Sequence, residues 1–470
     1  MSLSPVKILE CPQIQSTNPS HGYEILGSVN VTSHKDLISI VEKARHAQIK
    51  WQSLGVDKRC ELVGQLLETL KANREEFIER TSREMGMPLD LSRGVVYGGF
   101  EKISWNLENA PKFLKPTILF EDDQEVNKQI LEPFGVMACI VAWNFPFGNF
   151  ATSVIPALLA GNTVVMKYSE EVPLFSKFLE EITRESKALP EGVLNFVYGD
   201  GVVGSLMCEQ DFDLISFTGS SSTGQKIYEA AAKKLIPVCL ELGGSSPGIV
   251  FEDTKLTDEL IQSIFWKRFL NTAQFCDGLK RLIVHESLFD ECVRKLSAYA
   301  ATVKIGDPLD RNTQLGPLVA ERQVIKLEDQ IKDAVNKGAK IVCGGKRPSA
   351  LSGAYYQPTI LTNITPDMRV WKEEVFGPAL PIVSFKNYDE ALQLANDTDY
   401  GLSAVVYSDD EKILELAFSD IKAGSVEDGF TNYYRPQNPF GGYKQSGIGR
   451  QGGAIGFREV CQVKVKAYRK

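Results

Sequence analysis

The sequence predicts an α/β fold in which helices cover parallel β-sheets. Between residues 138 and 241, short β-rich runs alternate with segments of helical periodicity, and the same alternation returns between residues 248 and 419. Such alternation produces βαβ units, because consecutive parallel strands need a long crossover that is usually a helix. The two blocks therefore predict two α/β domains.

Length and composition agree with a globular protein. The chain has 470 residues, and at about 150 residues per domain this predicts roughly three domains. Hydrophobic residues make up 43% and charged residues 24%, which argues against a disordered or fibrous protein. The chain has 52 basic and 60 acidic residues and a net charge of −8, whereas nucleic-acid binding usually needs a basic excess. No nucleic-acid partner is expected.

The N-terminal region is predicted to be helical. Residues 33–36 have the spacing of a capping box, and apolar residues follow them at helical intervals up to residue 44. A second stripe of leucines follows Asp57. Neither segment carries residues with obvious chemistry, so both are predicted to be packing layers.

The first block contains an uncharged run at residues 134–166, which is long enough to span a bilayer. Asn144, Pro146 and Asn162 interrupt it, and such interruptions make a poor membrane span. The run is therefore predicted to be a strand (138–142), a loop (143–149), a helix (150–160) and another strand (163–166). Further strands are predicted at 194–197, 214–218 and 237–241, with helices at 173–188 and 223–234.

The second block is predicted to contain strands at 248–251, 281–285, 340–343, 380–385 and 402–407. Helices are expected near 257–270, 288–303, 319–337, 387–396 and 410–419. Outside both blocks, residues 126–131 and 461–467 alternate apolar and polar side chains as half-buried strands do. Strands away from both sheets could pair with another subunit.

Parallel sheets bind ligands at the carboxyl ends of their strands, and this rule selects Trp143, Asn144, Lys167, Gly219 and Glu241. A buried Glu241 would have a raised pKa and could act as a general base, or it could cap the following turn. The small-residue loop 219–224 could face a phosphate at a helix N-terminus, but it lacks the G-x-G-x-x-G spacing and could be an ordinary turn.

Lys167 with Glu170 could hold sugar hydroxyls, or the two could form a solvated ion pair.

The cysteines indicate neither a disulfide framework nor a metal site, and any one of them is more often a buried structural residue than a nucleophile. Nine cysteines are scattered without a C-x-x-C pair, and only four histidines are present. Cys276 lies in a polar loop between a helix and a strand, where a thiolate could form, but spacing alone does not separate it from Cys239. The N-terminus lacks the apolar core of a signal peptide, so a cytoplasmic location is expected.

Eight motifs together resemble the aldehyde dehydrogenase superfamily from about residue 15 to the C-terminus. They are PFGV at 133–136, WNFP at 143–146, GNTVVMK at 161–167, FTGS at 217–220, ELGG at 241–244, QFC at 274–276, EEVFGP at 373–378 and PFGGYKQSG at 439–447. The resemblance implies a Rossmann-like NAD-binding domain (1–117 and 134–243), a catalytic α/β domain (244–440) and a small β oligomerisation element (118–133 and 441–470). A homodimer or homotetramer is expected.

The resemblance also implies the chemistry. Cys276 would attack the aldehyde carbon, and the Asn144 amide with the backbone N–H of Cys276 would form the oxyanion hole. Hydride transfer from the thiohemiacetal to NAD⁺ would leave a thioester, and Glu241 would activate the water that hydrolyses it.

The implied cofactor contacts extend over both blocks. They are Trp143, Lys167, Ser169, Glu170, Gly219, Ser220, Gly224, Leu242, Glu374 and Phe376. A carboxylate at position 170 would repel a 2′-phosphate, so NAD is preferred, with NADP possible.

By the same resemblance, the substrate tunnel is lined by Phe145, Gly148, Asn149, Thr152, Phe275, Asp277 and the segment 430–435, which begins at Phe430. Succinate-semialdehyde dehydrogenases resemble one another in having an Arg where Thr152 stands. The absence of that Arg argues against this substrate, although Arg435 could substitute for it. Asp277 would disfavour a dianionic substrate. The expected substrate is a small to medium, polar aldehyde or semialdehyde.

Four residues depart from the family pattern: Ala273, Tyr168, Gly429 and Gln451.

Three other functions are alternatives to this one. A coenzyme-A-acylating relative has less need of Glu241, and a non-catalytic relative has no need of Cys276, Asn144 and Glu241. A cofactor-free cysteine hydrolase would need a histidine near the motifs.

Overall fold

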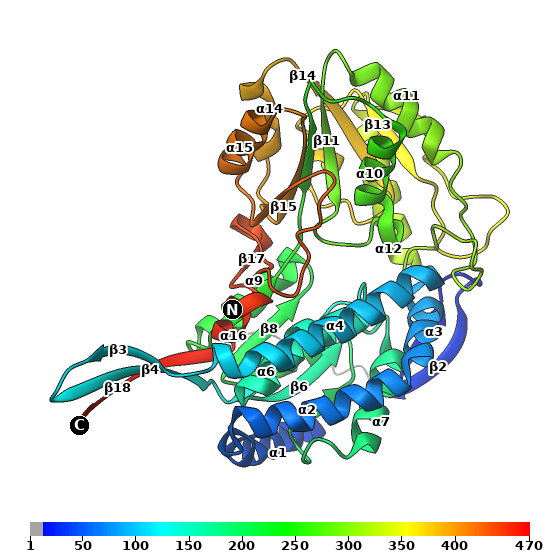
Figure 1. Cartoon of the computed structure of the whole chain (residues 1–470). Coiled ribbons are helices and arrows are strands. Elements are labelled where there is room, and N and C mark those ends of the chain that lie inside the picture. The colour runs from blue at the N-terminus through cyan, green and yellow to red at the C-terminus, as the bar shows by residue number, and fades with distance from the viewer. Residues whose placement is uncertain (1–12) are drawn as a thin grey trace, which may run out of the picture.

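The computed structural model describes residues 13–470, within which the strands form four sheets (Figure 1). Residues 1–12, which include Cys11 and the start of the proposed cofactor domain, lie outside the described part. In residues 13–470 no helix combines the length and the apolar character needed to cross a lipid bilayer. The mixed α/β class with largely parallel sheets is confirmed.

The first large sheet has six strands, and all five strands predicted for the first block lie in it. Its order is β17 (Gly447–Ile448), β9 (Val238–Glu241), β8 (Leu214–Thr218), β5 (Val136–Val141), β6 (Thr163–Tyr168) and β7 (Leu194–Val197). β9 to β7 run parallel, and only β17 is antiparallel to its neighbour. The carboxyl ends of the five parallel strands therefore lie along one edge.

Helices cover both faces of this sheet because its strands are apolar on both sides. In β5, Met137, Cys139 and Val141 face one core while Val136, Ala138 and Ile140 face another. The first face is covered by α2 (Gly55–Ala72), α3 (Arg74–Met85), α4 (Leu89–Phe113), α6 (Ile155–Ala160) and α7 (Pro173–Ser186). The second face is covered by α1 (His34–Ser53), α8 (Gly201–Glu209) and α9 (Ser221–Ala232).

The uncharged run is buried between these elements, but the prediction of a loop at 143–149 is partly wrong. The chain becomes helical at Pro146, with α5 (Pro146–Asn149), a π-helical turn (Phe150–Val154) and then α6. Proline is well suited to the first helical position because its missing N–H would have no partner there. The Asn149 amide donates to the Ala142 carbonyl over 2.9 Å and closes the turn.

The second large sheet has seven strands and comes from the second block. Its order is β12 (Lys340–Cys343), β13 (Thr359–Thr362), β14 (Ala379–Phe385), β11 (Leu279–His285), β10 (Ser246–Val250), β15 (Ser403–Tyr407) and β16 (Ser425–Asp428). On one face lie α10 (Asp258–Phe269) and α11 (Phe289–Ala300), and on the other α14 (Tyr388–Asn396) and α15 (Glu411–Asp420). α12 (Glu321–Asn336) and the short α13 (Arg369–Lys372) pack on a further core near β13.

β13 and β16 were not predicted. Each is only four residues long, and β16 is an edge strand with the acidic sequence SVED.

A three-stranded antiparallel sheet extends away from the rest of the molecule (Figure 1). β18 (Cys461–Arg469) pairs along its whole length with β4 (Glu125–Pro133), and β3 (Thr117–Glu121) adds the third strand. The two strands predicted outside the blocks therefore pair with each other. Not all of residues 441–470 belongs to this sheet, because β17 joins the first large sheet and α16 (Gly453–Glu459) packs beside α6.

A hairpin of β1 (Gln13–Asn18) and β2 (Glu24–Asn30) was also not predicted.

The chain first crosses between the two large sheets after β9, and it returns to the first sheet between β16 and β17. β9 ends at Glu241 on the carboxyl edge of the first sheet, and β10 starts at Ser246 on the amino edge of the second. β11, the parallel neighbour of β10, is preceded directly by the loop that contains Cys276. The facing edges of the two sheets thus bring Glu241 and Cys276 together.

Candidate active site

The loop before Cys276 has an uncommon backbone. After α10 ends, Asn271, Thr272 and Ala273 have φ values of 51°, 54° and 63°, in the left-handed region. L-amino acids disfavour this region because Cβ approaches a carbonyl oxygen. Such a conformation persists only where surrounding contacts hold it, and it is most often found at functional sites.

Several hydrogen bonds hold this loop in place. The Thr272 hydroxyl donates to the Gly316 carbonyl at 2.9 Å, and the Gln274 side chain accepts from the Val319 N–H at 2.8 Å. On the other side, Lys280 Nζ donates to the Phe275 carbonyl at 2.5 Å. Lys280 was not predicted as a site residue, since in the sequence it stands inside an otherwise apolar strand.

Lys280 is buried near Cys276. Its ammonium lies 4.9 Å from the centroid of the Phe376 ring and 5.5 Å from that of Phe275, so two aromatic faces contact it. Burial and the nearby Arg268 lower the pKa of Lys280, while Glu374 acts in the opposite direction.

Asn144 lies against the same loop. Its side-chain amide donates to the Gln274 carbonyl at 3.1 Å, while Asn271 donates to the Asn144 carbonyl at 3.2 Å. An amide NH₂ group has two N–H bonds, and one is fixed here by Gln274. The second is available to an oxygen atom beside Cys276.

Glu241 is followed by a turn, containing Gly244, that packs tightly against the Cys276 loop. A Cβ at Gly244 would lie 2.6 Å from the Cys276 carbonyl oxygen, so only glycine lets the two loops touch. Both carboxylate oxygens of Glu241 are buried without a hydrogen-bond partner among the described residues. Burial raises the pKa of Glu241 well above its usual range, and Arg450 opposes this shift. This is the electrostatic setting of a general base.

The structure separates Cys276 from Cys239. Cys239 is buried inside β9, whereas Cys276 is partly exposed on its loop. Burial, Asp277 and Glu374 raise the pKa of the Cys276 thiol, and Lys280 lowers it. All eight cysteines in residues 13–470 are free.

The cofactor residues predicted from the first block lie along the carboxyl edge of the six-stranded sheet, as the strand-end rule predicts. Ser220 caps α9 by accepting from the Thr223 N–H at 3.3 Å. At Gly224 a Cβ would lie 2.5 Å from the Leu242 side chain, so glycine permits the close packing of α9 on this turn. Gly219 is equally tight, since its Cβ would meet the Phe217 ring at 2.4 Å.

Lys167 and Glu170 follow the end of β6. Lys167 is buried, which lowers its pKa, and its ammonium donates to the Tyr168 carbonyl at 3.1 Å. The Glu170 carboxylate accepts from Ser169 at 3.3 Å and lies 3.6 Å from the Arg322 guanidinium. Arg322 comes from α12 in the second block, so the sequence pattern around Lys167 gave no sign of it.

Glu374 and Phe376 approach from the second sheet. The Gly244 N–H donates to Glu374 Oε1 at 3.2 Å, and the Phe376 ring meets Trp143 edge-to-face with centroids 5.6 Å apart. The buried Arg268 donates to the Val375 carbonyl at 3.1 Å and so holds this segment. Residues from the two sheets therefore face each other across one site.

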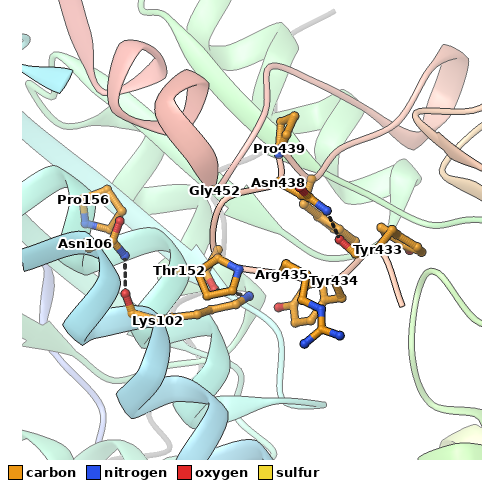
Figure 2. A pocket seen from close by; sticks show the side chains of 12 residues that line it. Lys102, Asn106, Thr152, Pro156, Tyr433, Tyr434, Arg435, Asn438, Pro439 and Gly452 are labelled. Atoms are coloured by element: carbon orange, nitrogen blue, oxygen red, sulfur yellow. Dashed lines mark hydrogen bonds between the residues drawn. The ribbon is translucent and has the colours of Figure 1, made fainter. Parts of the chain in front are cut away.

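The predicted tunnel residues separate into two groups. Thr152 lines a cavity together with the loop around Tyr433 (Figure 2), and Tyr433 donates to Asp277 Oδ2 at 2.6 Å. Phe430, in contrast, is 57% exposed and packs on Tyr407 outside this cavity.

The remaining predicted tunnel positions are not among the residues that line this cavity. Phe145 and Gly148 flank the start of α5. The Asn149 amide donates to the Ala142 carbonyl in the turn after β5. The Phe275 ring lies near Gly278 and Lys280.

Comparison with known proteins agrees with this geometry. The sequence model described as the aldehyde dehydrogenase family matches residues 9–466. The chain belongs to the aldehyde dehydrogenase family. Its general reaction is therefore the oxidation of an aldehyde.

Two curated relatives of this aldehyde dehydrogenase family member illustrate the similarity. It is 37% identical to aminoaldehyde dehydrogenase 1, peroxisomal, of Pisum sativum, over 96% of this chain and 92% of the relative. It is 35% identical to betaine aldehyde dehydrogenase of Bacillus subtilis (strain 168), over 97% and 94%. Among solved structures, betaine aldehyde dehydrogenase from Staphylococcus aureus in complex with NAD⁺ superposes with a TM-score of 0.93 at 31% identity, covering 97% and 91%.

The four departures from the aldehyde dehydrogenase pattern have structural counterparts. A Cβ at Gly429 would lie 1.9 Å from the Tyr407 ring, so a side chain there needs a smaller neighbour. The Tyr168 hydroxyl donates to the Pro146 carbonyl at 2.8 Å and ties β6 to α5. Gln451 donates to Ser153 at 3.1 Å, and Ala273 has the positive φ described above.

Proposed function

We propose that the protein oxidises an aldehyde to the carboxylic acid with NAD⁺, through a covalent intermediate on Cys276. The observation that carries this proposal is the meeting of Cys276, Asn144 and Glu241 between the two sheets. The three residues have complementary chemistry: a thiol nucleophile, an amide donor and a buried carboxylate.

In the first step, Cys276 Sγ forms a bond to the aldehyde carbon. The carbonyl oxygen becomes negatively charged and accepts hydrogen bonds from Asn144 and from the Cys276 backbone N–H. One such donor contributes about 3 kcal/mol to transition-state stabilisation. The contact with Gln274 orients the Asn144 amide before the substrate arrives.

In the last step, the acyl group leaves the thiol as a carboxylic acid. Glu241 takes a proton from the water that attacks the thioester carbon, and the thiol of Cys276 is released. Burial raises the pKa of Glu241, and a raised pKa makes this carboxylate a stronger base than an exposed one.

The described residues fit a bound dinucleotide. The capped N-terminus of α9 offers backbone N–H groups to a pyrophosphate, and Gly219 and Gly224 permit the tight packing around it. The Lys167 ammonium has three N–H bonds, of which the Tyr168 carbonyl takes one, so the others can reach ribose hydroxyls. When bound, NAD⁺ supplies the hydride acceptor, and Glu374 and Phe376 would hold its nicotinamide end.

The second candidate cofactor is NADP⁺, and Arg322 is the observation that favours it. A carboxylate at Glu170 discriminates against a 2′-phosphate. The Arg322 guanidinium 3.6 Å away offsets that charge only in part, because it also donates to Glu171 at 2.7 Å. Dissociation constants of NAD⁺ and NADP⁺, measured by tryptophan fluorescence, test this point. Arg322→Ala should weaken NADP⁺ binding more than NAD⁺ binding, and equal effects would remove Arg322 from cofactor choice.

The proposed function is tested with purified protein, a panel of aldehydes and NAD⁺, followed by the absorbance of the reduced cofactor. Cys276→Ala should abolish turnover while leaving NAD⁺ binding intact. Glu241→Gln should release one equivalent of reduced cofactor in a burst and then stall as a thioester. Absence of NAD⁺ reduction with every aldehyde, with or without coenzyme A, would overturn the proposal.

Addition of coenzyme A distinguishes the proposed hydrolytic enzyme from a coenzyme-A-acylating enzyme. In a coenzyme-A-acylating enzyme, a thiol rather than water takes the acyl group, and acyl-coenzyme A accumulates. With Glu241 buried beside Cys276, we expect the free acid as the product in both conditions.

We also propose a division into an NAD-binding domain (1–117 and 134–243), a catalytic domain (244–440) and an oligomerisation element (118–133 and 441–470). We propose that the three-stranded sheet of this last element assembles the protein into a homodimer or homotetramer. The support is the exposure of apolar side chains on this sheet, including Phe120 on β3 and Val463 and Val465 on β18.

A further inference from the structure

The cavity in Figure 2 is placed to receive the far end of a substrate. It lies between α4, the helical segment after Pro146 and the loop at residues 433–440. Tyr433 lines it and donates to Asp277, the residue next to Cys276. An aldehyde held by Cys276 can therefore extend toward this cavity.

Two positive side chains line the cavity, and none of its lining residues is acidic. Lys102 reaches from α4 and donates to Thr152 at 3.3 Å, and Arg435 lies on the facing loop. Within residues 13–470, neither cation forms an ion pair with a carboxylate, although many exposed lysines and arginines elsewhere do. Two unneutralised cations on one cavity favour an anionic ligand.

One aromatic face of the cavity, that of Tyr434, is already occupied by a cation. The Lys102 ammonium lies 3.5 Å from the centroid of the Tyr434 ring, so the protein's own lysine occupies that face. A quaternary or primary ammonium would need such a face and would meet two like charges instead. This argues against the nitrogen-bearing aldehydes after which the two curated relatives are named.

We propose that this cavity binds a carboxylate at the far end of the substrate, with Lys102 and Arg435 as its partners. The substrate class is then a short aldehyde with a terminal carboxylate. This inference rests on the proposed function, because it concerns the same reaction. Asp277 lies next to Cys276, and one of its oxygens already accepts from Tyr433, so a single carboxylate beyond it is compatible with the site.

The test compares three aldehydes of similar length in the full-length protein: 4-oxobutanoate, its methyl ester and 4-aminobutanal. We expect kcat/KM for 4-oxobutanoate to exceed that of the other two by about tenfold or more, as loss of a charge-assisted hydrogen bond implies. In Lys102→Met and in Arg435→Gln, the ratio of kcat/KM for the acid to that for the ester should fall about tenfold through KM. Lys102→Arg should retain most of the ratio.

The matched control is Lys112→Met, which removes an exposed lysine from the same helix outside the cavity and should leave all three values unchanged. A wild-type enzyme that oxidises the ester or the amine as well as the acid would overturn the inference while leaving the proposed function intact. A preference for the acid that survives in Lys102→Met/Arg435→Gln would show that the carboxylate binds elsewhere. No oxidation of any aldehyde would instead refute the proposed function.

Discussion

Ala273 shows how a single residue stores strain beside the nucleophile. The residue is fully buried and has a φ of 63°, at a position where the family pattern usually has glycine. A non-glycine residue in this region costs about 1–2 kcal/mol, because its Cβ crowds the backbone. The hydrogen bonds of Thr272, Gln274 and Lys280 offset that cost by fixing the loop.

Ala273→Gly should therefore stabilise the protein by about 0.5–1 kcal/mol, the strain released less the extra entropy of an unfolded glycine. Urea unfolding followed by circular dichroism measures the change. Ala230→Gly, in the right-handed helix α9, is the matched control and should destabilise by about 1 kcal/mol. Destabilisation by both substitutions would show that the Ala273 backbone is not strained.

Lys280 is the second residue whose role depends on its surroundings. It donates to the Phe275 carbonyl, and its charge is the one cause that lowers the pKa of Cys276 against burial and three carboxylates, Asp277, Glu374 and Glu241. Lysine is a flexible ammonium whose charge responds to burial, so it can both hold a loop and adjust a neighbouring thiol.

Lys280→Met should slow turnover by about tenfold, if it removes one charge-assisted hydrogen bond to the loop. It should also move the pH midpoint for alkylation of Cys276 upward, because the thiolate loses its nearest favourable charge. Iodoacetamide labelling of Cys276 at a series of pH values, quantified by mass spectrometry, measures the shift. Lys58→Met, an exposed lysine on α2, is the control, and identical pH profiles for Lys280→Met and wild type would refute the role.

At the scale of elements, helix α7 is capped by a residue from another helix. α7 begins with Pro173, which has no N–H, and its own N-cap residue makes no side-chain hydrogen bond. Glu84 of α3 accepts from the Leu174 and Phe175 N–H groups, both at 2.7 Å, and from Ser16 at 2.7 Å. One buried carboxylate thus joins α3, α7 and β1.

Glu84→Ala should lower the free energy of unfolding by about 2–3 kcal/mol, because it leaves two buried helix N–H groups without a partner. Glu79→Ala on the same helix removes only an exposed pair with Arg83 and should cost less than about 0.5 kcal/mol. Thermal unfolding of the two variants side by side distinguishes them. Equal losses would mean that the cap contributes nothing beyond a surface ion pair.

At the scale of the whole molecule, the three-stranded sheet is the part least covered by the rest of the chain (Figure 1). Ile118, Leu119 and Phe120 on β3 and Val463 and Val465 on β18 are each about half exposed. Exposed apolar side chains on a sheet with open edges favour association with another copy of the chain.

The double substitution Val463→Asp with Val465→Asp should therefore give a monomer of 52.1 kDa in light scattering coupled to size-exclusion chromatography. The wild type should elute as two or four chains. Leu235→Asp changes the most exposed apolar side chain of the body, at 89% exposure, and should leave the assembly unchanged. A monomeric wild type would refute the assembly proposal.

Local patterns predicted most of the fold. Every strand expected from residues 138 to 241 is present, because apolar β-rich runs between helical segments have few alternatives in an α/β protein. The hairpin of β1 and β2 was not predicted, and neither were the short strands β13 and β16, which become strands by pairing with β14 and β15 rather than by local periodicity.

The candidate site could be predicted only in part. Motif order selected Cys276, Asn144 and Glu241, and strand ends selected most cofactor residues. Spacing could not separate Cys276 from Cys239, which differ in exposure and not in local sequence. The sequence also did not distinguish Phe430 from Tyr433 within the predicted tunnel segment. Tyr433 contacts Asp277, whereas Phe430 packs on Tyr407.

The sequence by itself determined the α/β class, the order of the strands along the chain and the family, since these depend on periodicity and on short motifs. Only the tertiary structure decided which charges meet. Lys102 reaches Tyr434, Arg322 reaches Glu170, and Lys280 lies near Cys276 with Phe376 against it. The physical reason is that burial and Coulomb energy depend on distances in space, and these partners come from elements that only packing brings together.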